Sequence, residues 1–122
     1  MKVKDIMNPI VRTCHPSDEL AWAAELMWEN DCGVLPVVGE GGNAVGMITD
    51  RDICMAAAMN HQNLNNLAVE TVISGDLYAC HAEDEIHTAL ATMRERRVRR
   101  LPVIGADGVP VGILSLNDLV RH

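Results

Sequence analysis

The sequence predicts an α/β (α+β) protein built from two similar β-α-β-β-α repeats. The first observation is a motif that occurs twice at an offset of 66 residues: residues 46–52 are Gly-Met-Ile-Thr-Asp-Arg-Asp and residues 112–118 are Gly-Ile-Leu-Ser-Leu-Asn-Asp. The second is an apolar run with a central proline before each motif, at residues 34–38 and 100–104. The third is that the same offset persists along nearly the whole chain without insertion or deletion. We therefore predict a tandem duplication whose halves are related by a pseudo-twofold axis.

In the first half, the best-defined element is a helix that begins after Ser17 or Asp18, either of which could cap it, and extends to about residue 30. Apolar residues recur there at three- and four-residue steps and predict one buried face, formed by Leu20, Ala23, Ala24, Met27 and Trp28. Gly33 is expected to close this helix. The other expected elements are a helical turn at 3–8, an extended segment at 10–14, strands at 34–38 and 45–49, a turn at 40–43 and a helix at 50–59.

The second half repeats this plan after a polar link. We expect one repeat at residues 1–60, a linker at 61–67 and the other repeat at 68–122. Halves of roughly 60 residues are marginal alone, so they are expected to share one core. The expected elements are an arm at 69–73, an extended segment at 78–80, helices at 84–97 and 116–120, a turn at 106–108 and strands at 100–104 and 111–115.

Composition and charge exclude several classes of protein. The 122 residues are 48% hydrophobic but only 2% aromatic, so aliphatic residues and Met must fill the core. A formal charge of −7 argues against broad contact with nucleic acid or an anionic membrane. No secretory signal or membrane-spanning run is visible, and the four Cys form no CxxC pair, so a cytoplasmic location is expected.

The doubled motifs resemble a pair of CBS domains (cystathionine-β-synthase-type repeats, also called a Bateman module). The resemblance rests on the proline-containing strands around Pro36 and Pro102, the Gly-h-x-Ser/Thr-x-x-Asp motifs at 46–52 and 112–118, and the opening Asp5-Ile6-Met7. It covers essentially the whole chain, as in a stand-alone CBS-pair protein. It implies binding of AMP, ADP, ATP or S-adenosylmethionine in clefts between the repeats, with occupancy reported to an unknown regulated protein. It also implies a homodimer, a flat disc of four repeats, and no obligatory cofactor.

The resemblance also implies which residues bind the ligand. Asp52 and Asp118 would accept hydrogen bonds from the ribose hydroxyls, and Thr49 and Ser115 would contact the ribose or phosphate. The adenine and the inner phosphate would be bracketed by the adjoining strand residues Val34, Leu35, Pro36, Met47, Arg100, Leu101, Pro102 and Ile113.

Physical chemistry is consistent with these roles. A carboxylate accepts both hydroxyl donors of a cis-diol, and a helix N-terminus favours an anion. Arg51 and Arg100 could supply positive charge to a phosphate. The alternative is that Thr49-x-x-Asp52 and Ser115-x-x-Asp118 are only helix caps, which a duplication would copy as well.

The acidic chain contains one basic segment, residues 94–100, with five arginines in seven residues. Most of these arginines are interpreted as a solvated helix end, where the dipole favours cations. We select Arg99 and Arg100 as site residues because they precede the Leu-Pro strand. The first half has Val34 where the second has Arg100, and Arg51 has no counterpart, so the two clefts are expected to differ in affinity or phosphate preference. One short patch is a poor footprint for nucleic acid.

Two Cys-His pairs also recur, Cys14-His15 and Cys80-His81. Together they could supply four zinc ligands or a redox-responsive thiol pair. Adjacent residues in an extended segment point to opposite faces, which favours a buried thiol followed by an exposed His. No catalytic motif is present, so we expect a sensor and not an enzyme. The remaining alternative is a ligand-free structural or interaction module.

Overall fold

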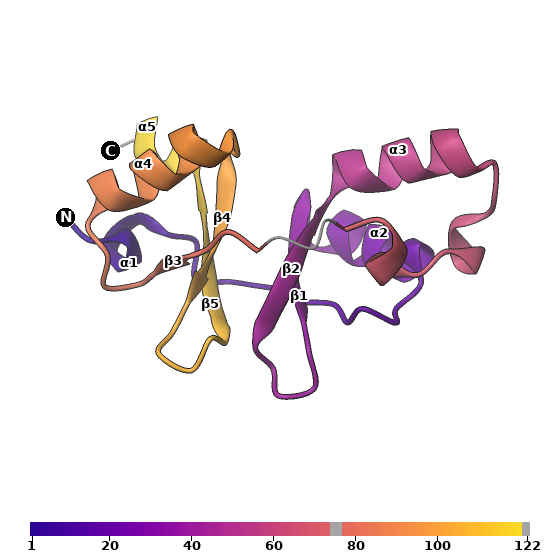
Figure 1. The fold of residues 1–122 in the computed structure, drawn as a ribbon, viewed down its shortest axis with the longest axis horizontal. Helices are drawn as coiled ribbons and strands as arrows, with labels where there is room; N and C mark the ends of the chain where they lie inside the picture. The colour runs from indigo at the N-terminus through magenta and orange to yellow at the C-terminus, as the bar shows by residue number, and fades with distance from the viewer. Residues whose placement is uncertain (74–76, 121–122) are drawn as a thin grey trace. The chain divides into compact units, whose positions relative to one another are not determined.

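The computed structural model describes residues 1–73 and 77–120. Figure 1 shows an alternation of short helices with two small sheets, in the order expected for a duplicated β-α-β-β-α unit. The elements are α1 (Val3–Ile6), α2 (Leu20–Glu29), β1 (Val34–Val38), β2 (Ala44–Thr49), α3 (Asp50–Asn60), the 3₁₀ turns η1 (Leu64–Asn66) and η2 (Val69–Thr71), β3 (Cys80–His81), α4 (Ile86–Arg96), β4 (Arg100–Ile104), β5 (Pro110–Ser115) and α5 (Leu116–Val120).

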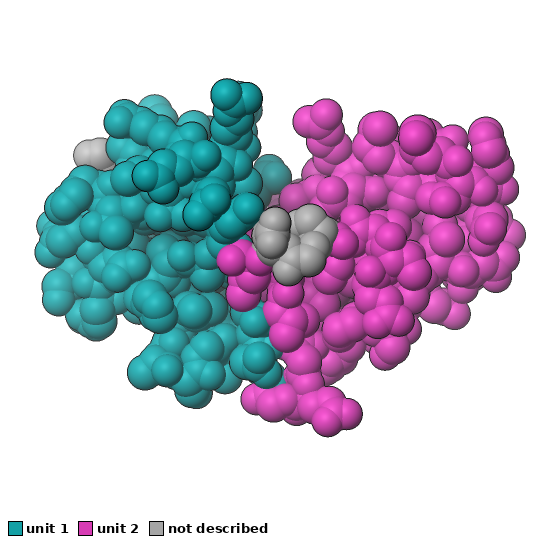
Figure 2. Space-filling view, viewed as in Figure 1, with its two compact units in different colours: residues 1–11, 42–44, 78–122 teal, residues 12–41, 45–77 magenta. Residues whose placement is uncertain are grey.

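The chain forms two compact units that do not coincide with the two halves of the sequence (Figure 2). Unit 1 consists of Met1–Val11, Gly42–Ala44 and Tyr78–His122, and unit 2 of Arg12–Gly41 and Val45–Leu77. The N-terminal arm therefore belongs to the unit formed by the second half. The boundaries proposed from the sequence for the two repeats stay a prediction.

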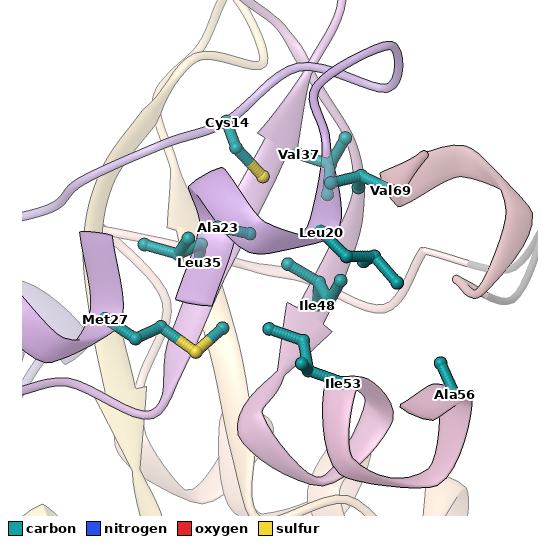
Figure 3. Packing of buried hydrophobic residues seen from close by; sticks show 10 residues of the cluster. All are labelled: Cys14, Leu20, Ala23, Met27, Leu35, Val37, Ile48, Ile53, Ala56 and Val69. Carbon is teal, nitrogen blue, oxygen red and sulfur yellow. The ribbon is translucent and has the colours of Figure 1, made fainter. Parts of the chain in front are cut away.

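Unit 2 is built around the β1–β2 sheet and the apolar face of α2. Every residue of β1 is buried, as expected for a continuous apolar strand. Leu20, Ala23 and Met27 of α2 are buried at three- and four-residue steps. Figure 3 shows these side chains packed with Leu35, Val37 and Ile48 of the sheet and with Val69. Aliphatic and sulfur-containing side chains fill this core.

Unit 1 contains a three-stranded sheet in the order β3-β4-β5. β3 is parallel to β4, with Cys80 opposite Val103, and β4 is antiparallel to β5, with Leu101 opposite Leu114. In the first half, the residues equivalent to β3 form only an isolated parallel bridge, between Cys14 and Val37. The expected extended segment at 10–14 is thus reduced to a single pairing.

Each half of the sequence lends its opening arm to the core of the other half. The Val3 N–H donates to Asp84 O at 2.9 Å, and the Val69 N–H donates to Asp18 O at 2.8 Å. Both valines are fully buried, Val3 in the core of unit 1 and Val69 in that of unit 2. The four residues obey the 66-residue offset, so the exchange is reciprocal.

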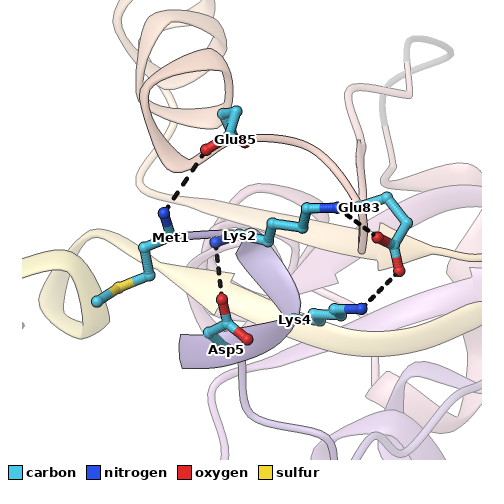
Figure 4. Close-up of polar contacts among 6 residues, drawn as sticks. All are labelled: Met1, Lys2, Lys4, Asp5, Glu83 and Glu85. Carbon is cyan, nitrogen blue, oxygen red and sulfur yellow. Dashed lines mark hydrogen bonds and ion pairs between the residues drawn. The ribbon is translucent and has the colours of Figure 1, made fainter.

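An ion cluster adds polar contacts to the N-terminal arm within unit 1 (Figure 4). Lys2 Nζ and Lys4 Nζ each lie 2.9 Å from a carboxylate oxygen of Glu83. Hydrogen bonds from Lys4 and Lys2 lower the pKa of Glu83 to about 2, and the same contact with Glu83 raises the pKa of Lys2. The cluster is exposed to solvent, so its contribution is screened.

The structure corrects the expected start of the first long helix. α2 begins at Leu20, with Glu19 at the N-cap and no capping bond from its side chain. Asp18 Oδ2 instead accepts the backbone N–H of His15 at 2.8 Å, and Asp84 does the same for His81 at 2.9 Å. Aspartate side chains compete for local backbone donors in this way, so they form turns before both helices.

The structure also corrects two expectations about the sides and end of that helix. Trp28 is 87% exposed and lies outside the stripe of Leu20, Ala23 and Met27, because adjacent helix positions differ by about 100°. The left-handed residue after the helix is Asp31, with φ of 50°, and not Gly33.

Among residues 1–73 and 77–120, no helix is both long and apolar enough to cross a bilayer.

Candidate functional site

The first motif lies in unit 2, where β2 ends and α3 begins. Thr49 is the N-cap of α3, and its Oγ1 accepts the backbone N–H of Asp52 at 3.1 Å. In return, the Thr49 N–H donates to Asp52 Oδ2 at 2.9 Å. This reciprocal pair is a capping box with Asp in place of Glu, and it fixes the two half-buried side chains beside each other.

The second motif lies in unit 1 and has the same geometry. The Ser115 N–H donates to Asp118 Oδ2 at 2.9 Å, and Ser115 Oγ accepts the Asp118 N–H at 3.2 Å. The helix that it opens, α5, has only five residues. The expected helix-dipole contribution to anion binding is therefore weaker here than at α3, which has eleven residues.

Each capping aspartate uses one carboxylate oxygen in its box. Within the described residues, Oδ1 of Asp52 and of Asp118 has no hydrogen-bond partner. Such an oxygen can accept hydrogen bonds from the hydroxyls of a bound molecule. Each carboxylate can therefore cap its helix through Oδ2 and still accept a ribose hydroxyl through Oδ1.

Most of the apolar residues selected as ligand contacts have their side chains in the cores. Leu35 and Leu101 are fully buried, as are Pro36 and Pro102, and Val34 is 8% exposed. Met47 and Ile113 are half-buried. In this conformation the strand residues can offer a ligand mainly their backbone groups. Their direct contact with a ligand stays a prediction.

Backbone hydrogen bonds join the residue that precedes β1 or β4 to the motif of the same unit. The Asp50 N–H donates to Gly33 O at 2.9 Å in unit 2, and the Leu116 N–H donates to Arg99 O at 2.8 Å in unit 1. Arg100 also pairs with Ser115 in the β4–β5 register. The predicted residues Arg99 and Arg100 are thereby positioned beside Ser115, and their side chains are exposed, as is that of Arg51 on α3.

The contact between Gly33 and Asp50 was not predicted from the sequence. A Cβ built on Gly33 would lie 2.9 Å from Asp50 Oδ2, so a larger residue at position 33 would require the exposed Asp50 side chain to move. The equivalent pair in unit 1 is Arg99 and Leu116. The signal that could have revealed this difference was present in the 66-residue alignment, because it pairs Gly33 with Arg99 and Asp50 with Leu116.

The repeated glycine of the motif admits the exchanged arm. A Cβ on Gly112 would lie 2.7 Å from Met7 Sδ and 2.8 Å from Asn8 O. Asn8 and Ile113 also exchange two backbone hydrogen bonds, of 2.9 and 3.0 Å. A side chain at position 112 would push the arm away from β5.

The Cys-His pairs have the geometry of structural thiols. Cys14 and Cys80 are buried, whereas His15 and His81 are exposed. Burial, with a smaller contribution from Asp18 or Asp84, raises the pKa of Cys14 and of Cys80 to about 12. No three His, Cys, Asp or Glu side chains come together as metal ligands in the part of the chain that the structure describes.

Unit 1 also has an open hollow of about 380 Å³, one of whose lining residues, Leu119, directly follows Asp118. It is lined by Met1, Ile6, Glu85, Ile86, His87 and Leu119. None of these is a predicted site residue.

The duplicated strand–helix junctions, exchanged arms and proline-containing strands match a known family along the chain. The model of the CBS domain matches residues 3–58 and again residues 69–122. This chain belongs to the CBS domain family. It contains two CBS domains in tandem, each of the β-α-β-β-α type, as the sequence predicted.

The chain is similar to curated relatives and to solved structures, some of which contain a ligand. Hypoxic response protein 1 of Mycobacterium tuberculosis is 34% identical over 98% of this chain and 82% of its own length. A solved structure of Hypoxic Response Protein I with two coordinated zinc ions has a TM-score of 0.88, 34% identity and coverage of 100% of this chain and 98% of that one. The CBS domain pair of MJ0100, in complex with 5′-methylthioadenosine and S-adenosyl-L-methionine, has a TM-score of 0.88, 26% identity and coverage of 99% and 94%. CBSX2 in complex with AMP has a TM-score of 0.83, 28% identity and coverage of 98% and 93%.

Proposed function

We propose that this CBS pair is a cytoplasmic regulatory module that binds adenosine-containing ligands and signals their level to a partner protein. The observation that supports it best is the presence of adenosine compounds in two relatives that align with 98–99% of this chain. The Thr49–Asp52 and Ser115–Asp118 pairs supply, in each unit, a hydroxyl and a carboxylate of the kind that a ribose requires. AMP, ADP, ATP and S-adenosylmethionine are the candidate ligands, and no catalytic role is proposed.

Signalling would operate by a shift of population. A ligand that binds one arrangement of the protein more tightly than another favours that arrangement, and a partner that distinguishes the two responds. A ligand that binds both arrangements equally would transmit nothing. We propose that the working assembly is a homodimer, and the partner is a protein of unknown identity.

Calorimetric titration of the purified protein with AMP, ATP and S-adenosylmethionine tests the proposal. We expect saturable binding of at least one ligand, and its loss in Asp52→Ala or Asp118→Ala, depending on which motif binds it. Asp5→Ala is the matched control, because the Asp5 carboxylate also accepts a backbone N–H at the start of a helix, that of Lys2 at 2.8 Å, but lies outside both motifs. Absence of binding by all three ligands, on folded protein shown to be free of co-purified ligand, would contradict the proposal.

A ligand-free structural module is the main alternative, since helix capping alone gives both Thr/Ser-x-x-Asp motifs a structural role. Under this hypothesis Asp52→Ala would weaken folding by about 1 kcal/mol and change nothing else.

A zinc- or redox-responsive protein is the remaining alternative. The two zinc ions in the structure of Hypoxic Response Protein I support considering zinc binding. The raised pKa of Cys14 and of Cys80 opposes it, because the thiolate is the form that binds zinc. Metal analysis of protein purified without chelator distinguishes it: stoichiometric zinc that Cys14→Ser or Cys80→Ser removes would favour this hypothesis.

A further inference from the structure

The two CBS motifs share one backbone geometry but differ in charge beside it. In unit 1, Arg99 O accepts the Leu116 N–H, and Arg100 pairs with Ser115. In unit 2, the equivalent hydrogen bond joins Gly33 and Asp50. The two residues joined by this hydrogen bond are therefore Arg99 and Leu116 in unit 1, one cationic and one apolar. In unit 2 they are Gly33, which has no side chain, and Asp50, which is a carboxylate.

The difference in charge extends along the segments that lead into β1 and β4. Residues 94–100 contain five arginines and one glutamate, whereas the equivalent residues 28–34 contain one glutamate, one aspartate and no cation. The charge difference is therefore a property of the whole segment.

Three of the five arginines have local structural roles. Arg94 and Arg96 lie in the last turn of α4, where cations are favoured by the helix dipole. The Arg96 guanidinium also lies 4.9 Å from the centre of the Tyr78 ring. Arg97 has a left-handed backbone, with φ of 55°, and caps α4. Only Arg99 and Arg100 combine exposure with backbone contact to the Ser115–Asp118 motif.

These arginines would have to supply the charge for any phosphate chain bound there. α5 has five residues and a correspondingly small dipole, so its start cannot substitute for a cation. A guanidinium binds phosphate oxygens through two parallel N–H donors, and two exposed arginines at neighbouring positions supply more charge to a chain of phosphates than to a single phosphate.

We infer that the motif of unit 1 binds a nucleoside polyphosphate through Arg99 and Arg100, while the motif of unit 2 prefers an adenosine compound without a phosphate chain. In unit 2, Asp50 Oδ2 would lie 2.9 Å from a Cβ at Gly33, so this position is occupied by negative charge. Arg51 lies between Asp50 and Asp52 in the sequence, and its backbone N–H donates to Asp50 Oδ1 at 2.8 Å. This inference rests on the proposed function and specifies its ligand for each motif.

The test is a titration series with adenosine, AMP, ADP and ATP on Asp52→Ala, in which the motif of unit 1 is the intact one. Affinity is expected to rise with each added phosphate and to fall with added salt. Arg99→Gln/Arg100→Gln in this background should lower ATP affinity about tenfold or more, the loss expected for a charge-assisted contact, and should lower adenosine affinity much less. Arg94→Gln, the same change of charge outside the proposed contact, should leave the series unchanged. Melting curves of all variants verify that they fold.

The outcomes separate the inference from the proposed function. If adenosine and ATP bind Asp52→Ala equally, or Arg99→Gln/Arg100→Gln binds ATP as tightly as its parent, the inference is wrong while adenosine binding stands. If ATP is bound only by Asp118→Ala, the assignment of the two motifs is reversed and the inference is also wrong. If no member of the series binds the unmodified protein, the proposed function fails and the inference fails with it.

Discussion

At the scale of single residues, the two capping aspartates unite a structural and a proposed ligand-binding role. In the pair Thr49 and Asp52, the backbone N–H of each residue donates to the side chain of the other. Ser115 and Asp118 form the same two hydrogen bonds. The Thr-x-x-Asp pattern was sufficient to predict this cap, because the hydrogen bonds are local. It was not sufficient to assign a ligand, because a cap and a ribose acceptor require the same residue types at the same spacing.

A double-mutant cycle at Thr49 and Asp52 measures the cap directly. Thr49→Ala and Asp52→Ala should each lower the free energy of unfolding by about 1 kcal/mol. The double variant should lose less than the sum, because each bond holds the turn that the other bond needs. Urea denaturation measures all three losses, with the exposed Ser17→Ala as a control expected to change little. Fully additive losses would show that the two hydrogen bonds act independently.

At the scale of elements, periodicity located the strands and helices but misplaced helix starts. The observed bounds of β1, β4 and α5 are those predicted from the sequence. The starts of α2 and α4 were wrong because Asp18 and Asp84 form turns with His15 and His81, which is a choice between two local hydrogen bonds that the sequence alone leaves open. Trp28 was misplaced because hydrophobicity, without the neighbouring sheet, does not define the edge of a buried face.

The ion cluster on α1 gives an element-scale prediction of pH dependence. The pKa of Glu83 is lowered to about 2 in the folded protein from an ordinary value of 4.5. Its stabilising contribution is therefore present above about pH 4.5 and is lost as pH falls towards 2. Thermal melts from pH 7 to pH 2 should show Glu83→Gln below the unmodified protein at pH 7 and converging with it at pH 2. The difference should shrink in salt, since the cluster is exposed.

Glu95→Gln is the matched control for this experiment. It removes a carboxylate from the exposed surface of α4 in the same unit. A pH dependence of the same size in Glu95→Gln would show that net charge, and not the contact of Glu83 with Lys2 and Lys4, is responsible.

At the scale of the whole molecule, the duplication predicted the family and the order of elements but not the exchange of arms. The 66-residue offset between Val3 and Val69 established that the two arms are equivalent. That equivalence holds whether each arm packs into the core of its own half or into that of the other half. The structure selects the opposite core, because the Val3 N–H donates to Asp84 O and the Val69 N–H donates to Asp18 O. Contacts between residues far apart in sequence decide this point, and local patterns contain no information about them.

The exchange predicts that a change in one arm weakens the sheet of the other half of the sequence. Val3→Ala should lower the free energy of unfolding by about 2 kcal/mol, since the valine is fully buried, and should increase amide hydrogen exchange in β4 and β5. Val69→Ala should have a similar cost and should increase exchange in β1 and β2. Val45→Ala, at a position 38% exposed in β2, is the control and should cost much less. If Val3→Ala increased exchange in β1 and β2 while β4 and β5 stayed protected, each arm would belong to its own half in solution, and the exchanged arrangement would be wrong.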